Sequence, residues 1–365
     1  MKNIKILHTA DLHLDSAFEA LPAGKAAIRR AEQRELLSRL AELARSERAD
    51  LVLLAGDIFD GGGMYFETGA EFVRCLRDMS VPVFIAPGNH DPYDARSPYA
   101  KLDMPQNVRI FTERDVECAE LPELGVRVYG AAFTGSTDGP DITNIRTERA
   151  EGTWNILCAH GEVGFDPVNE QALSASGLDY AALGHIHKAS GLRRSGGTWY
   201  SWPGCPEGRG FDETGEKTVS IVELSDSGCR LTPVCIASRR YEILPVEVTG
   251  CDPLLAVHTV LPENTARDVY RIVLTGEVDT PPDLSRLRRN LDDCFFSLQL
   301  RDETRLRQDV WERAEEDSLR GIFLRKLREK YNSAQSEERE LIEQAARWGL
   351  AALDNMEEVV RHEDK

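Results

Sequence analysis

The sequence predicts a layered α/β fold, and three patterns along the chain lead to this class. Strand-like and helix-like segments alternate up to about residue 80, which is typical of an α/β core. Short apolar runs separated by Gly-rich turns then dominate up to about residue 240. Beyond that point the chain follows a strand, helix, strand, helix, strand pattern and ends in charged helical segments. We therefore expect three regions, which are 1–240, 241–303 and 304–365.

The first region begins with a predicted strand at 4–9 and an amphipathic helix at 25–47 that carries many Arg and Glu residues. The continuous apolar run at 51–55 is typical of a strand buried on both faces. A helix at 67–79 and a strand at 81–86 follow. The remaining predicted strands of this region are 126–132, 154–159, 180–183, 199–202 and 219–223.

The second region is predicted to form a separate βαβαβ unit, with strands at 242–248, 270–274 and 295–300 and helices at 253–261 and 283–291. Two apolar stripes at helical spacing predict a pair of helices in the third region. The stripes consist of Leu319, Ile322, Phe323, Leu327 and Tyr331, and of Leu341, Ala345, Trp348, Ala352, Met356 and Val359. We place the break between these helices at Asn332-Ser333.

Composition excludes several classes of protein. The 365 residues contain 44 Lys plus Arg and 62 Asp plus Glu, and a net charge of -18 argues against a chain that grips polyanions over a broad surface. Eight cysteines without a Cys-x-x-Cys pair exclude a zinc ribbon and favour reduced thiols in the cytoplasm. The longest apolar runs are strand-sized, so we expect neither a signal peptide nor a membrane span.

Five polar clusters follow directly after predicted strands. They are Asp11-Leu12-His13, Gly56-Asp57-Ile58-Phe59-Asp60, Gly88-Asn89-His90-Asp91, His160-Gly161 and Gly184-His185-Ile186-His187. Because ligands of open α/β sheets bind at the carboxyl ends of the strands, these clusters can meet in one place. Glycines beside the polar residues permit the sharp turns that end such strands.

The clusters supply seven donors that suit divalent metal ions, namely Asp11, His13, Asp57, Asn89, His160, His185 and His187. Seven are too many for one ion and suit two ions, the standard arrangement for in-line displacement at phosphorus. Carboxylate, amide and imidazole donors without thiolate suit manganese, iron or zinc. His90 remains as a candidate to protonate the leaving oxygen, and Asp91 as a candidate to orient its ring.

These motifs resemble the ordered signature of the calcineurin-like metallophosphoesterases. The opening Leu7-His8-Thr9-Ala10-Asp11-Leu12-His13-Leu14, the Gly56–Asp60 cluster and the loop Trp202-Pro203-Gly204-Cys205-Pro206-Glu207-Gly208 are similar to the bacterial DNA-repair exonucleases of the SbcD and YhaO kind. The motif match covers the chain to about residue 215. One departure is Asp60, because archaeal and eukaryotic members of the nuclease family carry His there, so their endonuclease behaviour does not carry over.

The resemblance implies a βαβ sandwich core, a small capping domain and a C-terminal helical hairpin that docks on an SMC-like ATPase of the SbcC or YhaN kind. It implies two metal ions, usually Mn²⁺, one held by Asp11, His13, Asp57 and His187. The other would be held by Asp57, Asn89, His160 and His185. The implied activity is that of a metal-dependent DNA exonuclease in DNA repair, and relatives suggest a homodimer.

Residues around the clusters carry weaker expectations. His8, Asp15 and Asp60 are expected to support the ligands rather than to bind metal. Basic residues near the crevice could contact a phosphate backbone, and these are Arg96, Lys188, Arg193, Arg194 and Arg209. Two alternatives stay open: a phosphatase or small-molecule phosphodiesterase with the same metal centre, and an adaptor that recruits the ATPase while hydrolysing little.

Overall fold

The structure of the protein is a computed structural model that describes residues 1–61, 63–140, 142, 145–163, 167–168, 170–278, 280–306 and 310–353. The chain divides into two compact units. Unit 1 comprises Met1–Pro245, Leu261–Val273 and Ser285–Arg301, and unit 2 comprises Val246–Val260, Leu274–Leu284 and Asp302–Lys365. This division differs from the predicted borders at 240 and 303, which remain predictions.

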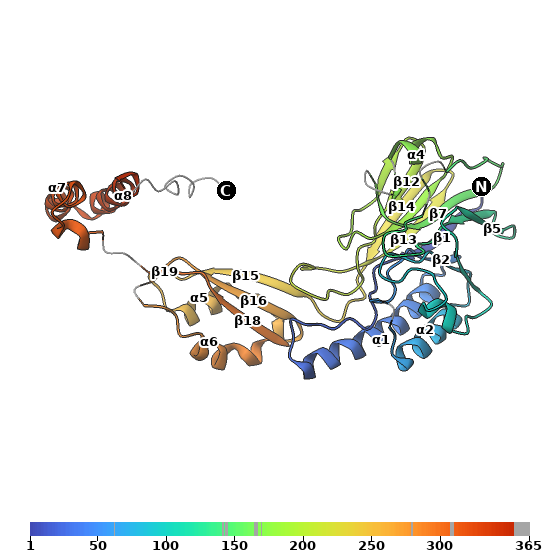
Figure 1. Cartoon of the computed structure of the whole chain (residues 1–365), viewed down its shortest axis with the longest axis horizontal. Coiled ribbons are helices and arrows are strands. Elements are labelled where there is room, and N and C mark those ends of the chain that lie inside the picture. The colour runs from blue at the N-terminus through green and yellow to red at the C-terminus, as the bar shows by residue number, and fades with distance from the viewer. Residues whose placement is uncertain are drawn as a thin grey trace. The chain divides into compact units, whose positions relative to one another are not determined.

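Unit 1 contains a six-stranded sheet with the order β14-β13-β1-β2-β3-β4. Its strands β14, β13, β1 and β2 are labelled in Figure 1. Its strands are β1 (Ile4–Thr9), β2 (Leu51–Leu54), β3 (Val83–Ile85), β4 (Val108–Ile110), β13 (Val219–Ser225) and β14 (Gly228–Val234). Strands β1 to β4 run parallel, whereas β13 pairs antiparallel with β1 and β14. The carboxyl ends of β1, β2 and β3 therefore lie along one edge of the sheet.

A second six-stranded sheet has the order β11-β12-β10-β7-β6-β5. Its strands are β5 (Glu117–Leu121), β6 (Val126–Gly130), β7 (Trp154–His160), β10 (Tyr180–Gly184), β11 (Arg193–Ser195) and β12 (Thr198–Ser201). Strands β6, β7, β10 and β12 run parallel, and β5 and β11 pair antiparallel at the two edges.

Alternating side chains of the first sheet build two hydrophobic layers. Leu54 of β2 packs in one cluster with Leu37 of the helix α1 (Ala23–Ser46) and Phe72 of α2 (Phe66–Met79). Leu53, on the opposite face, packs in another cluster with Ile156 of β7. Strand β2 is thus buried on both faces, which explains its continuous apolar run. The second sheet buries its other face against Leu173 of α4 (Glu170–Ala175).

The predicted βαβαβ pattern forms a three-stranded sheet with the order β15-β16-β18 and two helices. The elements are β15 (Tyr241–Glu247), α5 (Pro253–Val260), β16 (Val269–Thr275), α6 (Leu284–Leu291) and β18 (Ser297–Asp302). Short elements complete the described fold, namely α3 (Pro98–Lys101), β8 (Glu162–Val163), β9 (Pro167–Val168), β17 (Glu277–Val278) and β19 (Arg305–Leu306), with 3₁₀ turns at Thr265–Arg267, Asp292–Cys294 and Glu312–Glu315.

Two helices end the described part of unit 2, α7 (Leu319–Ser333) and α8 (Ser336–Leu353). They pack through Leu324 and Ala346. The predicted break falls within two residues of its expected position, while Met356 and Val359 of the predicted stripe lie outside the described residues. The predicted α/β class is confirmed. In the described parts of the chain, every helix is too short or too polar to cross a membrane.

Candidate metal centre

The five predicted clusters converge at the carboxyl ends of the central strands of unit 1. Strands β1, β2 and β3 come from one sheet, and β7 and β10 from the other, so each cluster enters the site by a different loop. Among the described residues, three groups of ligand atoms result, each with its members within 4.8 Å of one another. The first triad is Asp11, His13 and His187, the second triad is Asp57, His160 and His185, and a further group joins His13 to Asp60 and His90.

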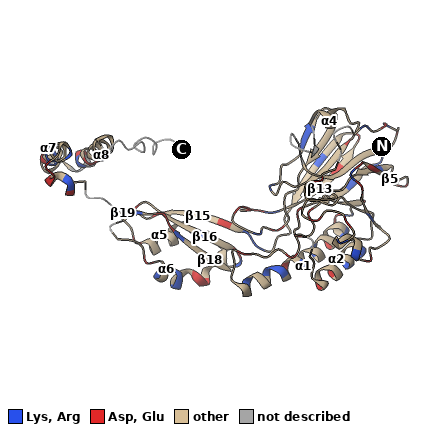
Figure 2. Cartoon of the chain, in the orientation of Figure 1, with Lys and Arg blue, Asp and Glu red and all other residues tan. Residues whose placement is uncertain are grey.

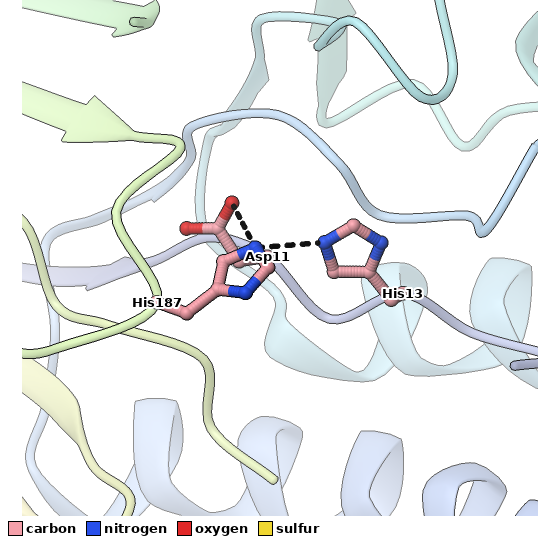
Figure 3. A group of neighbouring side chains, drawn as sticks. All are labelled: Asp11, His13 and His187. Carbon is pink, nitrogen blue, oxygen red and sulfur yellow. Dashed lines mark hydrogen bonds and ion pairs between the residues drawn. The ribbon is translucent and has the colours of Figure 1, made fainter. Parts of the chain in front are cut away.

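The first triad combines two buried residues with the partly exposed His187. His187 Nε2 lies 3.2 Å from His13 Nε2 and 3.8 Å from Asp11 Oδ1 (Figure 3). Asp11 and His13 are fully buried. The backbone N–H of His185 donates to both carboxylate oxygens of Asp11, at 3.0 and 3.1 Å, which fixes the carboxylate in the pocket. The three donor groups therefore face a common point.

The second triad is joined to the first through Asp57. Oδ2 of this carboxylate lies 3.3 Å from His160 Nε2 and 3.7 Å from His13 Nε2. Asn89 Oδ1 approaches His160 Nε2 to 3.1 Å, and the imidazoles of His160 and His185 meet edge to face with centroids 5.2 Å apart. Asp57 thus contacts a histidine from each triad, as a carboxylate shared by two ions would.

The hydrogen bonds behind these rings show that the residues fit metal ions. His160 Nδ1 lies 2.9 Å from the carbonyl oxygen of Ala55, which can only accept, so Nδ1 carries the proton. With Nδ1 protonated, Nε2 of His160 faces two more acceptors, the oxygens of Asp57 and Asn89, which require a second proton or a cation at that nitrogen. A cation among these atoms would satisfy all three at once, as ligating imidazoles require.

Burial and neighbouring charges shift the pKa values of the ionisable residues in the site. Burial raises the pKa of Asp11 to about 7, because neighbouring histidines offset only part of the desolvation cost. Burial also acts on Asp57, but the adjacent His160 and His13 outweigh it and lower the pKa of that carboxyl. The pKa of His160 shows the reciprocal effect, since Asp57 raises it to about 9 against the opposing effect of burial. Two buried carboxylates thus attract positive charge to this pocket.

The backbone of the loops is bent to aim these side chains. Asp11, His13, Asp57 and His185 all have positive φ, at 54°, 43°, 52° and 100°. Such conformations cost of order 1–3 kcal/mol each and concentrate at functional sites. At Gly184, a Cβ atom would overlap the carbonyl oxygen of Ala55 and would lie 2.7 Å from His160 Nδ1. Only glycine allows the two loops to approach this closely.

His90 and Asp91 differ in their surroundings. The His90 side chain is 47% exposed and its Nδ1 lies 3.5 Å from Asp60 Oδ1. Asp91, by contrast, is buried and accepts from the backbone N–H groups of Asp57, Ile58, Phe59 and Gly88 and from the Tyr99 hydroxyl. The predicted orienting role of Asp91 therefore needs correction, because its oxygens are engaged with the loop that carries Asp57.

Asp60 takes the place that the sequence suggested for Asp91. Its Oδ1 lies 3.4 Å from His13 Nδ1, and its Oδ2 accepts from the hydroxyl of Ser16 at 3.0 Å. The hydrogen bond from His13 lowers the pKa of the Asp60 carboxyl. One carboxylate thus contacts the outer nitrogens of both His13 and His90.

Glu213 is a site residue that the sequence reasoning missed. Its buried carboxylate lies 2.8 Å from His187 Nδ1 and accepts from the guanidinium of Arg209 at 2.6 Å. Against the effect of burial, these two partners lower the pKa of Glu213. The sequence feature that could have indicated Glu213 is its position shortly after the Trp202–Gly208 loop, four residues beyond Arg209. Arg209 is thus paired with Glu213, and its Nη1 lies 3.9 Å from Asp60 Oδ1, while its contact with substrate remains a prediction.

The other expected residues lie at varying distances from the triads. His8 is buried, and its Nδ1 lies 2.8 Å from the hydroxyl of Tyr180. Asp15 accepts from the backbone of Tyr65 and the hydroxyl of Thr68, so it joins its loop to the start of α2. The basic side chains Arg96, Lys188, Arg193 and Arg194 are exposed. Arg193 and Arg194 lie over the rings of Trp202 and Trp199.

The fold and these triads define a metal-dependent phosphoesterase. The chain belongs to the calcineurin-like phosphoesterase family, whose sequence model matches residues 4–189. Members of this family use a dinuclear metal site, and the predicted family resemblance and enzyme class are confirmed.

Three relatives are similar to the chain over much of its length. The metallophosphoesterase YhaO of Bacillus subtilis is 26% identical over 82% of this chain and 78% of the relative. The DNA double-strand break repair protein Mre11 of Aeropyrum pernix is 29% identical over 55% of this chain and 53% of its own length. The SbcD component of the SbcCD nuclease of Bacillus subtilis is 26% identical over 60% of this chain and 66% of its own length.

Proposed function

We propose that the chain is a manganese-dependent DNA exonuclease that acts in DNA repair together with an SMC-like ATPase. The observation that carries this proposal is the convergence of two triads on the shared carboxylate of Asp57. Relatives named as a nuclease component and as a DNA break repair protein support DNA as the substrate. The SbcCD nuclease is named as an assembly of more than one polypeptide, which supports a partner for this chain.

In this proposal Asp11, His13, Asp57 and His187 hold one ion, and Asp57, Asn89, His160 and His185 hold the other. The ions would activate a water molecule and neutralise charge that develops at phosphorus. His90 is exposed and lies beside the first triad, where it would donate a proton to the leaving oxygen of the scissile ester. Asp60 would hold the His90 ring, because its carboxylate faces Nδ1.

A cavity of about 640 Å³ lies beside His187. Lys188 and Lys217 line it together with the acidic Asp212, Glu213 and Glu216, so its charge is mixed. Basic and acidic residues are interleaved along α1 and α2 (Figure 2). We therefore expect the isolated chain to bind DNA weakly and in a salt-sensitive manner.

The partner part of the proposal rests on α7 and α8. These helices expose Leu319, Ile322, Leu341 and Trp348, with 69%, 47%, 65% and 55% of each side chain accessible. Apolar side chains on neighbouring helices are suited to docking on another protein.

For the homodimer, exposed Phe66 at the start of α2 is a candidate contact. The eight free cysteines suit the reducing cytoplasm, where we place the complex.

A labelled DNA duplex tests the proposal. Purified chain with Mn²⁺ should shorten the duplex from its ends, and Asp57→Asn should abolish shortening while the far-UV circular dichroism stays unchanged. His258→Asn is the matched control, because His258 is an exposed histidine of α5 outside both triads. Adding the purified ATPase should increase the rate, and Leu319→Asp combined with Trp348→Asp should remove that increase.

Two small substrates separate the nuclease from a phosphatase. The proposal predicts faster hydrolysis of bis(p-nitrophenyl) phosphate, a diester, than of p-nitrophenyl phosphate, a monoester. The reverse preference together with intact DNA would contradict the proposal and favour a phosphatase. Hydrolysis of neither ester, with ATPase binding retained, would favour an adaptor.

A further inference from the structure

Glu213 lies behind one histidine of the first triad rather than among the ligand atoms. Its Oε1 lies 2.8 Å from His187 Nδ1, while the opposite ring nitrogen, Nε2, faces Asp11 and His13. Only 3% of the Glu213 side chain is exposed, against 31% for His187. The carboxylate therefore sits on the side of the ring that points away from the proposed ions.

This contact determines which nitrogen of His187 carries the proton. A carboxylate can only accept, so a 2.8 Å approach places the hydrogen on Nδ1. The guanidinium of Arg209 lies farther from Nδ1, at 3.3 Å, and donates to the same Oε1 at 2.6 Å. Both donors thus point at Glu213. In the neutral ring the lone pair of Nε2 is then directed towards Asp11 and His13, as a metal ligand requires.

The position of Glu213 is itself held from several sides. Its Oε2 accepts from the backbone N–H of Arg209 at 2.8 Å. This hydrogen bond ties the carboxylate to the backbone four residues earlier in the chain. The same segment is anchored at Glu207, where buried Arg29 of α1 donates at 2.6 Å. Because these bonds leave the carboxylate little freedom, it can fix the ring plane of His187.

We propose that Glu213 is a positioning residue that holds His187 in the Nδ1–H tautomer and aims its Nε2 at the metal ion of the first triad. The inference rests on the proposed dinuclear centre. It predicts that removing the acceptor weakens one ion selectively, because Asp57, Asn89, His160 and His185 do not depend on Glu213. Carboxylates behind a ligating histidine typically change metal affinity about 10–100-fold.

Isothermal titration of the metal-free full chain with Mn²⁺ tests the inference without reference to catalysis. Glu213→Leu keeps most of the volume but removes the acceptor, and it should weaken one of two Mn²⁺ sites about 10–100-fold. Glu213→Gln keeps an oxygen acceptor at the same place and should restore most of the lost affinity. Asp212→Asn, an exposed neighbour that loses the same charge, should bind both ions like the wild-type chain.

The outcomes separate the inference from the proposed function. Wild-type chain that binds no Mn²⁺ would overturn the metal centre and the inference with it. Two ions bound with wild-type affinity by Glu213→Leu would overturn the inference alone. Equal weakening of both sites, or a failure of Glu213→Gln to recover affinity, would also contradict a role at His187. If Glu213→Leu does not melt cooperatively, Glu213→Ala replaces it, with the same expected loss at one site.

Discussion

The imidazole of His90 faces Asp60, whose Oδ1 lies 3.5 Å from its Nδ1, although Asp91 is its neighbour in the chain. The carboxylate of Asp91 points inwards and binds the backbone that leads to Asp57. The two aspartates therefore differ in their roles. We assign the orientation of the proposed proton donor to Asp60 and the support of the loop to Asp91.

His90→Asn is expected to lower kcat about 100- to 10,000-fold, the usual contribution of a general acid. Hydrolysis of bis(p-nitrophenyl) phosphate at saturating Mn²⁺ measures the loss. Binding of two Mn²⁺ ions should remain, because the metal ligands are other residues in this account. A loss of Mn²⁺ affinity that matches the loss of turnover would instead identify His90 as a ligand.

Asp91→Asn is expected to destabilise the fold by ~3 kcal/mol or more, since an amide cannot accept all the bonds that the buried carboxylate accepts now. Urea unfolding in EDTA measures this without a contribution from metal. The exposed Asp103→Asn should change stability by less than ~0.5 kcal/mol. A stable Asp91→Asn chain with impaired turnover would argue for a catalytic role and against ours.

The convergence of the seven candidate ligands could be predicted because each follows a strand whose apolar run is visible in the sequence, while their binding of metal remains a proposal. Side-chain direction was not predictable: the positive φ of Asp11 and Asp57 reverses the alternation expected of extended chain. Glu213 was missed because its partner His187 comes from another loop and no spacing rule joins them.

The fold likewise has elements that the sequence predicts and elements that it does not. The central strands β1 and β2 were predicted to within one residue, since burial on the interior faces imposes apolar side chains. The edge strand β14 was missed, because the alternation of Cys229, Arg230, Leu231 and Thr232 spans only four residues before Pro233. Strand β4 escaped notice because it is only three residues long.

Gly184→Ala is expected to cost roughly 3 kcal/mol, because the new methyl group would overlap the carbonyl oxygen of Ala55. The same overlap should displace His160 and weaken Mn²⁺ binding in a titration. Gly24→Ala meets open space in α1, so it should cost no stability and should leave Mn²⁺ binding unchanged. Unaltered melting and metal binding of Gly184→Ala would show that the two loops are not as close as described.

Stability should fall in acid through His8. Burial lowers the pKa of His8 from its ordinary value of 6.5 to about 3, so below pH 6.5 the unfolded chain binds a proton that the folded chain does not. Folding is therefore favoured above pH 6.5 and loses about 2 kcal/mol from this group by pH 5. Urea unfolding of the wild-type and His8→Gln chains at pH 6.5 and at pH 5, in EDTA, isolates the contribution of His8 to the loss of stability. Equal losses in the two chains would contradict a buried neutral His8.

Anomalous diffraction from crystals soaked in Mn²⁺ tests the central claim most directly. The account predicts two strong peaks at the carboxyl ends of β1, β2, β3, β7 and β10, one beside Asp11 and His13 and the other beside His160. A single difference map shows both, and crystals of Asp57→Asn should show weaker density at each position. Density at neither position in the wild-type chain, or manganese bound only elsewhere, would contradict the account.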